Sequence, residues 1–151
     1  MAEGHGNATV LLFVSDDCPI ANRYVPEILR LRDAYAGRGV GFWLVHGDPR
    51  ETVAQIREHA REFHLNIPEV RDPEHYLVKL AQAEVTPSAA VFGRDGRLVY
   101  HGRIDDRVTD LQRERPTPMR RDLAEALDAV LAGRAAPNAV TPAVGCSIPG
   151  L

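Results

Sequence analysis

The sequence predicts an α/β domain in which a central mixed β-sheet is flanked by helices and followed by an extended C-terminal tail. Apolar runs alternate with segments of helical periodicity in the first half of the chain, and this alternation is typical of parallel strands joined by right-handed crossovers. An Asp-Gly pair at residues 95–96 lies between two further apolar runs, which indicates an antiparallel hairpin. After residue 133 the periodicity ends and prolines recur.

The first strand is expected over residues 9–14 (TVLLFV), a continuous apolar run typical of a strand buried on both faces. A loop over residues 15–18 follows it. Helical spacing predicts a helix over residues 22–36, which Pro26 should kink because proline lacks the backbone N–H. Residues 40–46 (VGFWLVH) predict a second buried strand.

The next helix is expected to begin with Asp48 as its N-cap, Pro49 at its first position and Glu51 reaching back to the cap, and to run to about residue 64. Asp72-Pro73 predicts the start of a shorter helix in the same way.

The second half of the chain is expected to form the hairpin and a last helix. Residues 88–92 and 98–102 are the predicted strands, joined by a tight turn at 94–97. Thr117-Pro118 is expected to cap the last helix, which extends through residue 131.

The 151 residues fit one domain. We expect the domain proper over residues 1–133 and an extended tail over 134–151 that packs on the same domain. The net charge of −3 indicates no strongly positive surface, so neither nucleic acid nor a membrane is an expected partner. The first eight residues show no secretion signal, which predicts a soluble cytoplasmic protein as the chain stands and a periplasmic one if a leader has been removed.

Three features occur together around one cysteine. Cys18 follows the first strand at the mouth of a helix, Pro26 lies eight residues later, and Thr86-Pro87 precedes the hairpin that ends at Gly102. In this order and spacing the chain resembles the thioredoxin superfamily over residues 9–131. The resemblance implies a thioredoxin-like fold in which Pro87 is a cis-proline facing the reactive sulfur.

Within that superfamily, the long interval between Cys18 and Pro87 and the stretch DDCPIANRYVPEI resemble redoxin-like bacterial proteins. These are related to alkyl hydroperoxide reductase and the thiol-specific antioxidants. This finer resemblance implies an antioxidant activity.

The chain departs from the family patterns at five positions. Ala21 replaces the second cysteine of Cys-x-x-Cys, so no vicinal disulfide can form, and Leu12 replaces the buried acid of thioredoxins. Leu11 and Ser15 occupy the proline and threonine positions of the peroxiredoxin motif, although Ser15 can still donate a hydrogen bond. Asn22 stands where copper-assembly relatives carry their second cysteine.

Cys18 is the expected nucleophile, because a helix start stabilises a thiolate; Asp16 and Asp17 oppose this by their charge. The alternative is a vestigial cysteine in a structural domain. Cys146, in the tail, is either a resolving thiol that reaches Cys18 or an inert cysteine.

Four polar residues are expected near Cys18, because strands that end on the same side of a sheet form a crevice there. His46 can move a proton or merely cap its strand, and Arg103 can support a thiolate or belong to a surface ion-pair cluster. Asp105 and Asp106 are expected in that cluster.

Three further expectations concern aromatic and histidine side chains. Phe42 and Trp43 are expected in the core, and His59 and His64 in solvent. None of the remaining histidines shows metal-ligand spacing.

The leading functional hypothesis is a thiol–disulfide oxidoreductase with Cys18 as nucleophile, Cys146 as possible resolving thiol, and Thr86, Pro87, Ser15, His46 and Arg103 in support. Its partners would be a protein disulfide, a small thiol or a peroxide, with an external thiol as reductant and no cofactor or metal. The alternatives are a weak peroxiredoxin-like thiol peroxidase and a non-catalytic binding or scaffold domain. Copper binding by Cys18, His46 and Cys146 is a more distant one.

Overall fold

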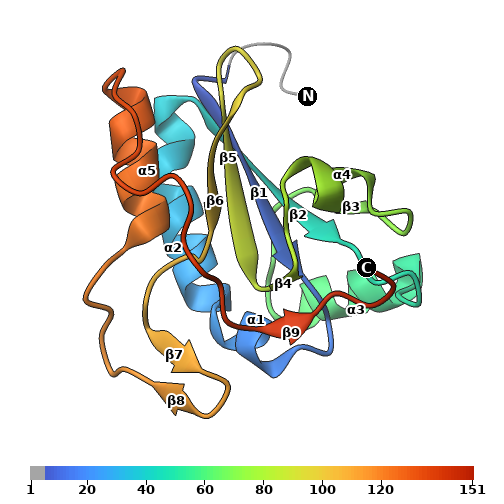
Figure 1. Ribbon diagram of the computed structural model, residues 1–151. Helices are drawn as coiled ribbons and strands as arrows, with labels where there is room; N and C mark the ends of the chain where they lie inside the picture. The colour runs from blue at the N-terminus through green and yellow to red at the C-terminus, as the bar shows by residue number, and fades with distance from the viewer. Residues whose placement is uncertain (1–5) are drawn as a thin grey trace.

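The computed structural model describes residues 6–151 and contains a five-stranded sheet in the order β3-β2-β1-β5-β6 (Figure 1). Strands β1, β2 and β3 run parallel, whereas β5 is antiparallel to both β1 and β6. The predicted central mixed sheet is therefore confirmed. Its strands are β1 (Ala8–Val14), β2 (Val40–His46), β3 (Glu69–Arg71), β5 (Ser88–Gly93) and β6 (Leu98–Gly102).

Helices cover both faces of this sheet. On one face Leu12 of β1 packs in the same cluster as residues of α2 and α5, and on the other Leu11 packs with Val78 of α4 (Figure 1). Neighbouring residues of a strand point to opposite faces, which is why an uninterrupted apolar run serves both layers. The helices are α1 (Pro19–Arg23), α2 (Val25–Tyr35), α3 (Val53–Glu62), α4 (Tyr76–Leu80) and α5 (Asp122–Leu131), with a 3₁₀ turn at Ala36–Arg38.

Four shorter strands lie outside the main sheet. β4 (Val85–Thr86) pairs with β9 (Cys146–Ser147), and β7 (Val108–Asp110) pairs with β8 (Arg113–Glu114). The sequence did not predict these four strands or β3, because strands of two or three residues are too short to display an alternating pattern.

The predicted kinked helix over residues 22–36 is instead two helices. α1 ends at Arg23, Tyr24 forms the junction, and α2 begins at Val25. Pro26 therefore lies in the first turn of α2, where its missing N–H leaves no helical hydrogen bond unmade.

The predicted N-cap at Asp48 is wrong. α3 begins five residues later, where Thr52 accepts a hydrogen bond from the Gln55 backbone N–H and the Gln55 side chain accepts one from Thr52 N–H. Asp48 closes a turn, in which its carboxylate accepts from the backbone N–H of Arg50. Asx turns and N-caps use the same side-chain chemistry, so the sequence does not distinguish them.

Two further helix starts also lie later than predicted. Asp72 accepts a hydrogen bond from the Val78 backbone N–H, but α4 begins only at Tyr76. The segment after Thr117-Pro118 is not helical; the carboxylate of Asp106 accepts from its backbone N–H groups, and α5 begins at Asp122.

Candidate active site

A disulfide joins Cys18 to Cys146, 128 residues apart in the chain and 6.2 Å apart between their Cα atoms. Cys18 lies in the loop after β1 and is the N-cap of α1, and Cys146 is the first residue of β9. The bridge therefore links the start of the domain to its tail.

The tail is positioned by pairing with the strand before the hairpin. Thr86 lies opposite Cys146 and Val85 opposite Ser147 in the β4–β9 register. At Gly145, a side chain would overlap the Thr86 carbonyl group, so only glycine allows this approach. The backbone thus carries Cys146 to the Cys18 sulfur.

Cys18 is enclosed by backbone groups. It is only 1% exposed, and its sulfur lies 3.5 Å from the Ala21 backbone nitrogen and 3.3 Å from the Thr86 carbonyl oxygen. The amide N–H can donate to a thiolate, and the carbonyl can accept from a thiol. Cys146 is half-buried, and both cysteines line a cavity of about 230 Å³.

Three expected supporting residues, Ser15, Thr86 and Pro87, adjoin the disulfide. The Ser15 hydroxyl donates to Asp17 Oδ1 at 2.7 Å, while the Ser15 carbonyl accepts from the Cys18 backbone N–H. The Thr86–Pro87 peptide bond is cis, and the Thr86 carbonyl oxygen lies beside the Cys18 sulfur.

The expectation that His46 serves the cysteine is not met. His46 is buried, and its Nδ1 and Nε2 lie 3.2 and 2.6 Å from carboxylate oxygens of Glu51 and Glu69. Both ring nitrogens are thereby engaged. Burial opposes the charged form, but the hydrogen bonds and charges of the two carboxylates outweigh it and raise the pKa of His46 to about 9.

This buried charge cluster still reaches the Cys18 loop, through Asp16. The Asp16 backbone N–H donates to Glu51 Oε2 at 3.0 Å, and burial together with the hydrogen bond and charge of Glu51 raises the pKa of Asp16 to about 6. The sequence did not reveal Glu51 and Glu69 as partners of His46, because Glu51 has the pattern of a helix start and the strand that holds Glu69 is too short to be predicted.

Arg103 takes the second of its two expected roles and forms an ion pair. Its Nε donates to Asp122 Oδ2 at 2.6 Å, so it stabilises the start of α5 rather than a thiolate. Asp105 accepts from the Tyr24 hydroxyl at 2.6 Å, and Asp106 accepts from backbone N–H groups and pairs with Arg115. Arg103, Asp105 and Asp106 thus stabilise the segments next to the hairpin of β5 and β6.

Two aromatic predictions need correction. His59 is buried rather than solvated, because its Nε2 bonds to Asn22 Oδ1 at 2.7 Å and its ring stacks on Phe63. Trp43 is only half-buried. Within residues 6–151 no group of three or more His, Cys, Asp and Glu side chains is placed to hold a metal ion, and His46 does not meet the two cysteines as the copper hypothesis required.

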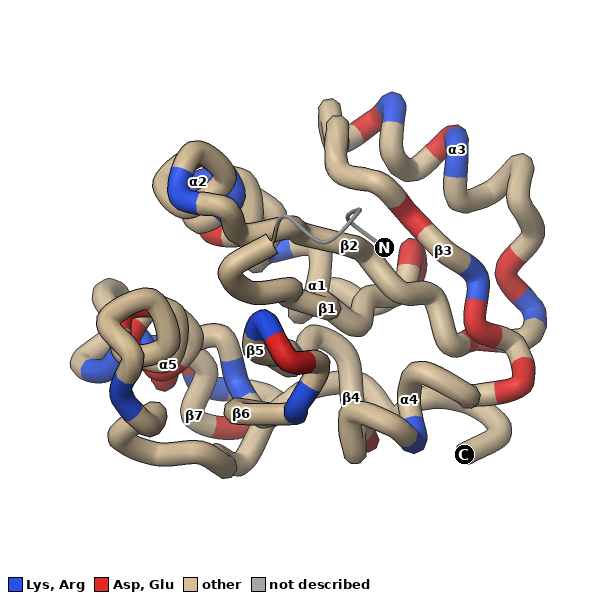
Figure 2. Tube along the Cα trace, turned by 90° about the horizontal axis from the view of Figure 1, so that it is seen from above, with Lys and Arg blue, Asp and Glu red and all other residues tan. Residues whose placement is uncertain are grey.

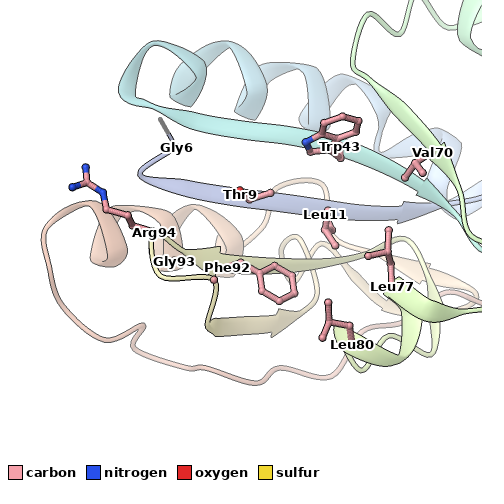
Figure 3. Close-up of a pocket in the computed structure, with 11 residues that line it drawn as sticks. Gly6, Thr9, Leu11, Trp43, Val70, Leu77, Leu80, Phe92, Gly93 and Arg94 are labelled. Atoms are coloured by element: carbon pink, nitrogen blue, oxygen red, sulfur yellow. The ribbon is translucent and has the colours of Figure 1, made fainter. Parts of the chain in front are cut away.

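A wider hollow lies away from the disulfide. It has a volume of about 530 Å³ and is walled by apolar side chains that include Leu11, Trp43, Leu77 and Phe92, as Figure 3 shows. Its one charged lining residue, Arg94, points away from the apolar walls. Since no thiol, carboxylate or imidazole lines it, the small cavity at the disulfide is the candidate active site.

Basic and acidic side chains are interspersed along the described part of the chain. Basic and acidic positions alternate along α3 and recur on the connecting segments, whereas β1 carries none (Figure 2). Over the part of the chain that the structure describes, no helix is long and apolar enough to cross a membrane.

Comparison with known proteins supports the fold. No protein-family model matches the chain, and no curated protein matches it. Among solved structures it is similar to an uncharacterized conserved protein from Geobacillus kaustophilus (29% identity, TM-score 0.82, covering 100% of this chain and 83% of that one). It is equally similar in shape to a hypothetical protein from Sinorhizobium meliloti 1021 (26% identity, TM-score 0.82, covering 96% and 80%).

A more distant similarity gives the fold type. A secreted Mycobacterium tuberculosis disulfide oxidoreductase homologous to E. coli DsbE matches with 18% identity and a TM-score of 0.57 over 87% of this chain and 85% of that one. The fold is therefore thioredoxin-like, as the sequence predicted.

Proposed function

We propose that this protein is a thiol–disulfide oxidoreductase in which Cys18 is the nucleophile and Cys146 the resolving thiol. The observation that carries the proposal is the disulfide between these residues, which supplies within one chain the partner that Ala21 removes from the usual motif. The thioredoxin-like neighbours support the same chemistry.

The reaction follows from the contacts of the two sulfurs. In the reduced protein the Cys18 thiolate, held by the Ala21 N–H, attacks one sulfur of a substrate disulfide; a mixed disulfide forms and one substrate thiolate leaves. The Cys146 thiolate then attacks the Cys18 sulfur, which closes the internal disulfide and releases the second substrate thiolate. The substrate gains two electrons, and an external thiol later restores the dithiol.

The finer resemblance to peroxide-reducing redoxins gives a second candidate substrate, a peroxide. Within this candidate site the Ser15 hydroxyl is turned to Asp17, so we rank disulfide exchange first.

The test uses the two single-serine variants with bis(2-hydroxyethyl) disulfide as substrate. We expect Cys146→Ser to accumulate a mixed disulfide on Cys18, seen by mass spectrometry, and Cys18→Ser to lose turnover. Retention of turnover by Cys18→Ser would overturn the proposal. Absence of any reaction in the unaltered reduced protein would favour the scaffold alternative.

A further inference from the structure

The edge of β4 beside the reactive cysteine is already occupied. An extended polypeptide commonly binds by adding a strand to a free sheet edge, and β4 is the strand next to the Cys18 sulfur. Its hydrogen-bonding partner is β9 of the protein's own tail. A protein substrate that paired with β4 would therefore have to displace the tail.

Contacts on both sides of Cys146 hold the tail without the disulfide. Upstream, the buried Thr141 shares its hydroxyl with the Tyr100 hydroxyl at 2.6 Å and accepts from the Arg103 backbone N–H at 3.0 Å. Downstream, Ile148 donates its N–H to the Glu84 carbonyl at 3.1 Å. The Ile148 side chain is 5% exposed and belongs to the same apolar cluster as Leu11 and Val78, on the α4 face of the sheet. Opening the disulfide removes none of these contacts.

Access to the sulfurs is then through the cavity of about 230 Å³. Pockets that enclose drug-sized ligands measure roughly 300–1,000 Å³, so this cavity suits a molecule of a few heavy atoms around a sulfur. A disulfide that belongs to a folded protein does not fit into this cavity, because the polypeptide around it would have to enter as well.

The sulfur that reacts with the substrate is also the more buried of the two. Cys18 is almost fully buried whereas Cys146 is half-buried, so a molecule that exchanges with Cys18 has to enter the cavity.

We propose that the centre exchanges electrons with low-molecular-weight thiols and disulfides rather than with protein disulfides. This inference rests on the proposed function. In the reducing direction one small thiolate attacks Cys18 Sγ, forming a mixed disulfide and releasing the Cys146 thiolate. A second attacks the small-molecule sulfur of that mixed disulfide, releasing a small disulfide and the Cys18 thiolate, which the Ala21 N–H stabilises. Two small thiols are oxidised, the protein disulfide is reduced, and the two thiol protons are left for the protein cysteines.

The first experiment compares two substrates at equal disulfide concentration. Reduced protein is mixed without oxygen with bis(2-hydroxyethyl) disulfide or with insulin, and loss of protein thiols is followed by alkylation and mass spectrometry. We expect a rate constant at least about a hundredfold higher for the small disulfide, since access governs exchange. Equal rates, or a faster reaction with insulin, would refute the inference and leave the proposed function standing. No reaction with either would refute the proposed function itself.

Variants that loosen the tail test the reason for this selectivity. Thr141→Ala and Thr141→Val, made separately, remove the hydroxyl that anchors the tail and keep both cysteines and the side chains that line the cavity. We expect either one to raise the insulin rate by about tenfold or more while the small-disulfide rate changes by less than about threefold. Val140→Ala, at an exposed position of the same tail, is the matched control and should change neither. Unchanged insulin rates in both folded variants would contradict the role of the tail.

The point of attack is tested on the oxidised protein. A brief reaction with limiting 2-mercaptoethanol, an acid quench and peptide mapping should place the adduct on Cys18 in excess over Cys146 by about tenfold or more. An adduct mainly on Cys146 would overturn this part of the proposal.

Discussion

The buried His46 makes the stability of the fold depend on pH. In the unfolded chain a histidine has a pKa of about 6.5. In the folded protein burial lowers the pKa of His46, but the carboxylates of Glu51 and Glu69 outweigh this effect and raise it to about 9. The folded state therefore binds the proton more tightly than the unfolded state. The stabilisation from this proton is complete below about pH 6.5 and is lost as the pH rises through about 9.

The two pKa values give the size of the effect. Each pKa unit corresponds to about 1.4 kcal/mol, so the rise in the pKa of His46 from its ordinary value of 6.5 to about 9 amounts to about 3 kcal/mol of unfolding free energy. Urea unfolding of the oxidised protein, followed by circular dichroism near pH 6 and near pH 9, measures it. The disulfide is kept closed so that neither cysteine titrates in this range.

Substitution of the histidine isolates its contribution. We expect His46→Gln to lower the unfolding free energy near pH 6 by roughly 3–5 kcal/mol, because it leaves two buried carboxylates without their cation. The variant should also lose most of the decline between pH 6 and 9. His64→Gln, at an exposed position, should keep that decline. A wild-type stability that is flat over this interval, or a decline that survives His46→Gln, would refute the reasoning.

Three further outcomes are expected. Cys146→Ser should lower the unfolding free energy relative to the oxidised protein by up to about 5 kcal/mol, the chain-entropy value for a loop of 128 residues, in urea titrations with and without reductant. Gly145→Ala should cost roughly 1–3 kcal/mol and slow reclosure of the disulfide, because a side chain overlaps the β4 backbone; Gly37→Ala, in open space, should change stability by less than about 0.5 kcal/mol. Stopped-flow mixing with hydrogen peroxide should show much slower oxidation than in a dedicated peroxiredoxin, since Leu11 and Ser15 occupy the motif positions; a peroxiredoxin-like rate would restore the peroxidase alternative.

The fold class could be predicted because its signals are local. The runs that became β1 and β2 are apolar along their length, and the Asp-Gly turn marks the hairpin of β5 and β6. Helix starts were predicted less well. Asp48 and Thr117 have the chemistry of caps, but the chain uses other groups, because a carboxylate or hydroxyl closes a turn as readily as a helix.

The residues alone were enough to predict the mixed α/β architecture, Cys18 at a helix start, and Cys146 as its one possible intramolecular disulfide partner. Whether the two cysteines meet depends on the packing of the tail. The tail reaches Cys18 through the β4–β9 pairing and the buried Ile148, and such contacts depend on residues distant in the chain. Tertiary structure likewise placed His46 between Glu51 and Glu69, away from the cysteine. A histidine at the end of a strand has several polar side chains within reach. Only the packing of the folded chain determines which of them are buried beside it as hydrogen-bonding partners.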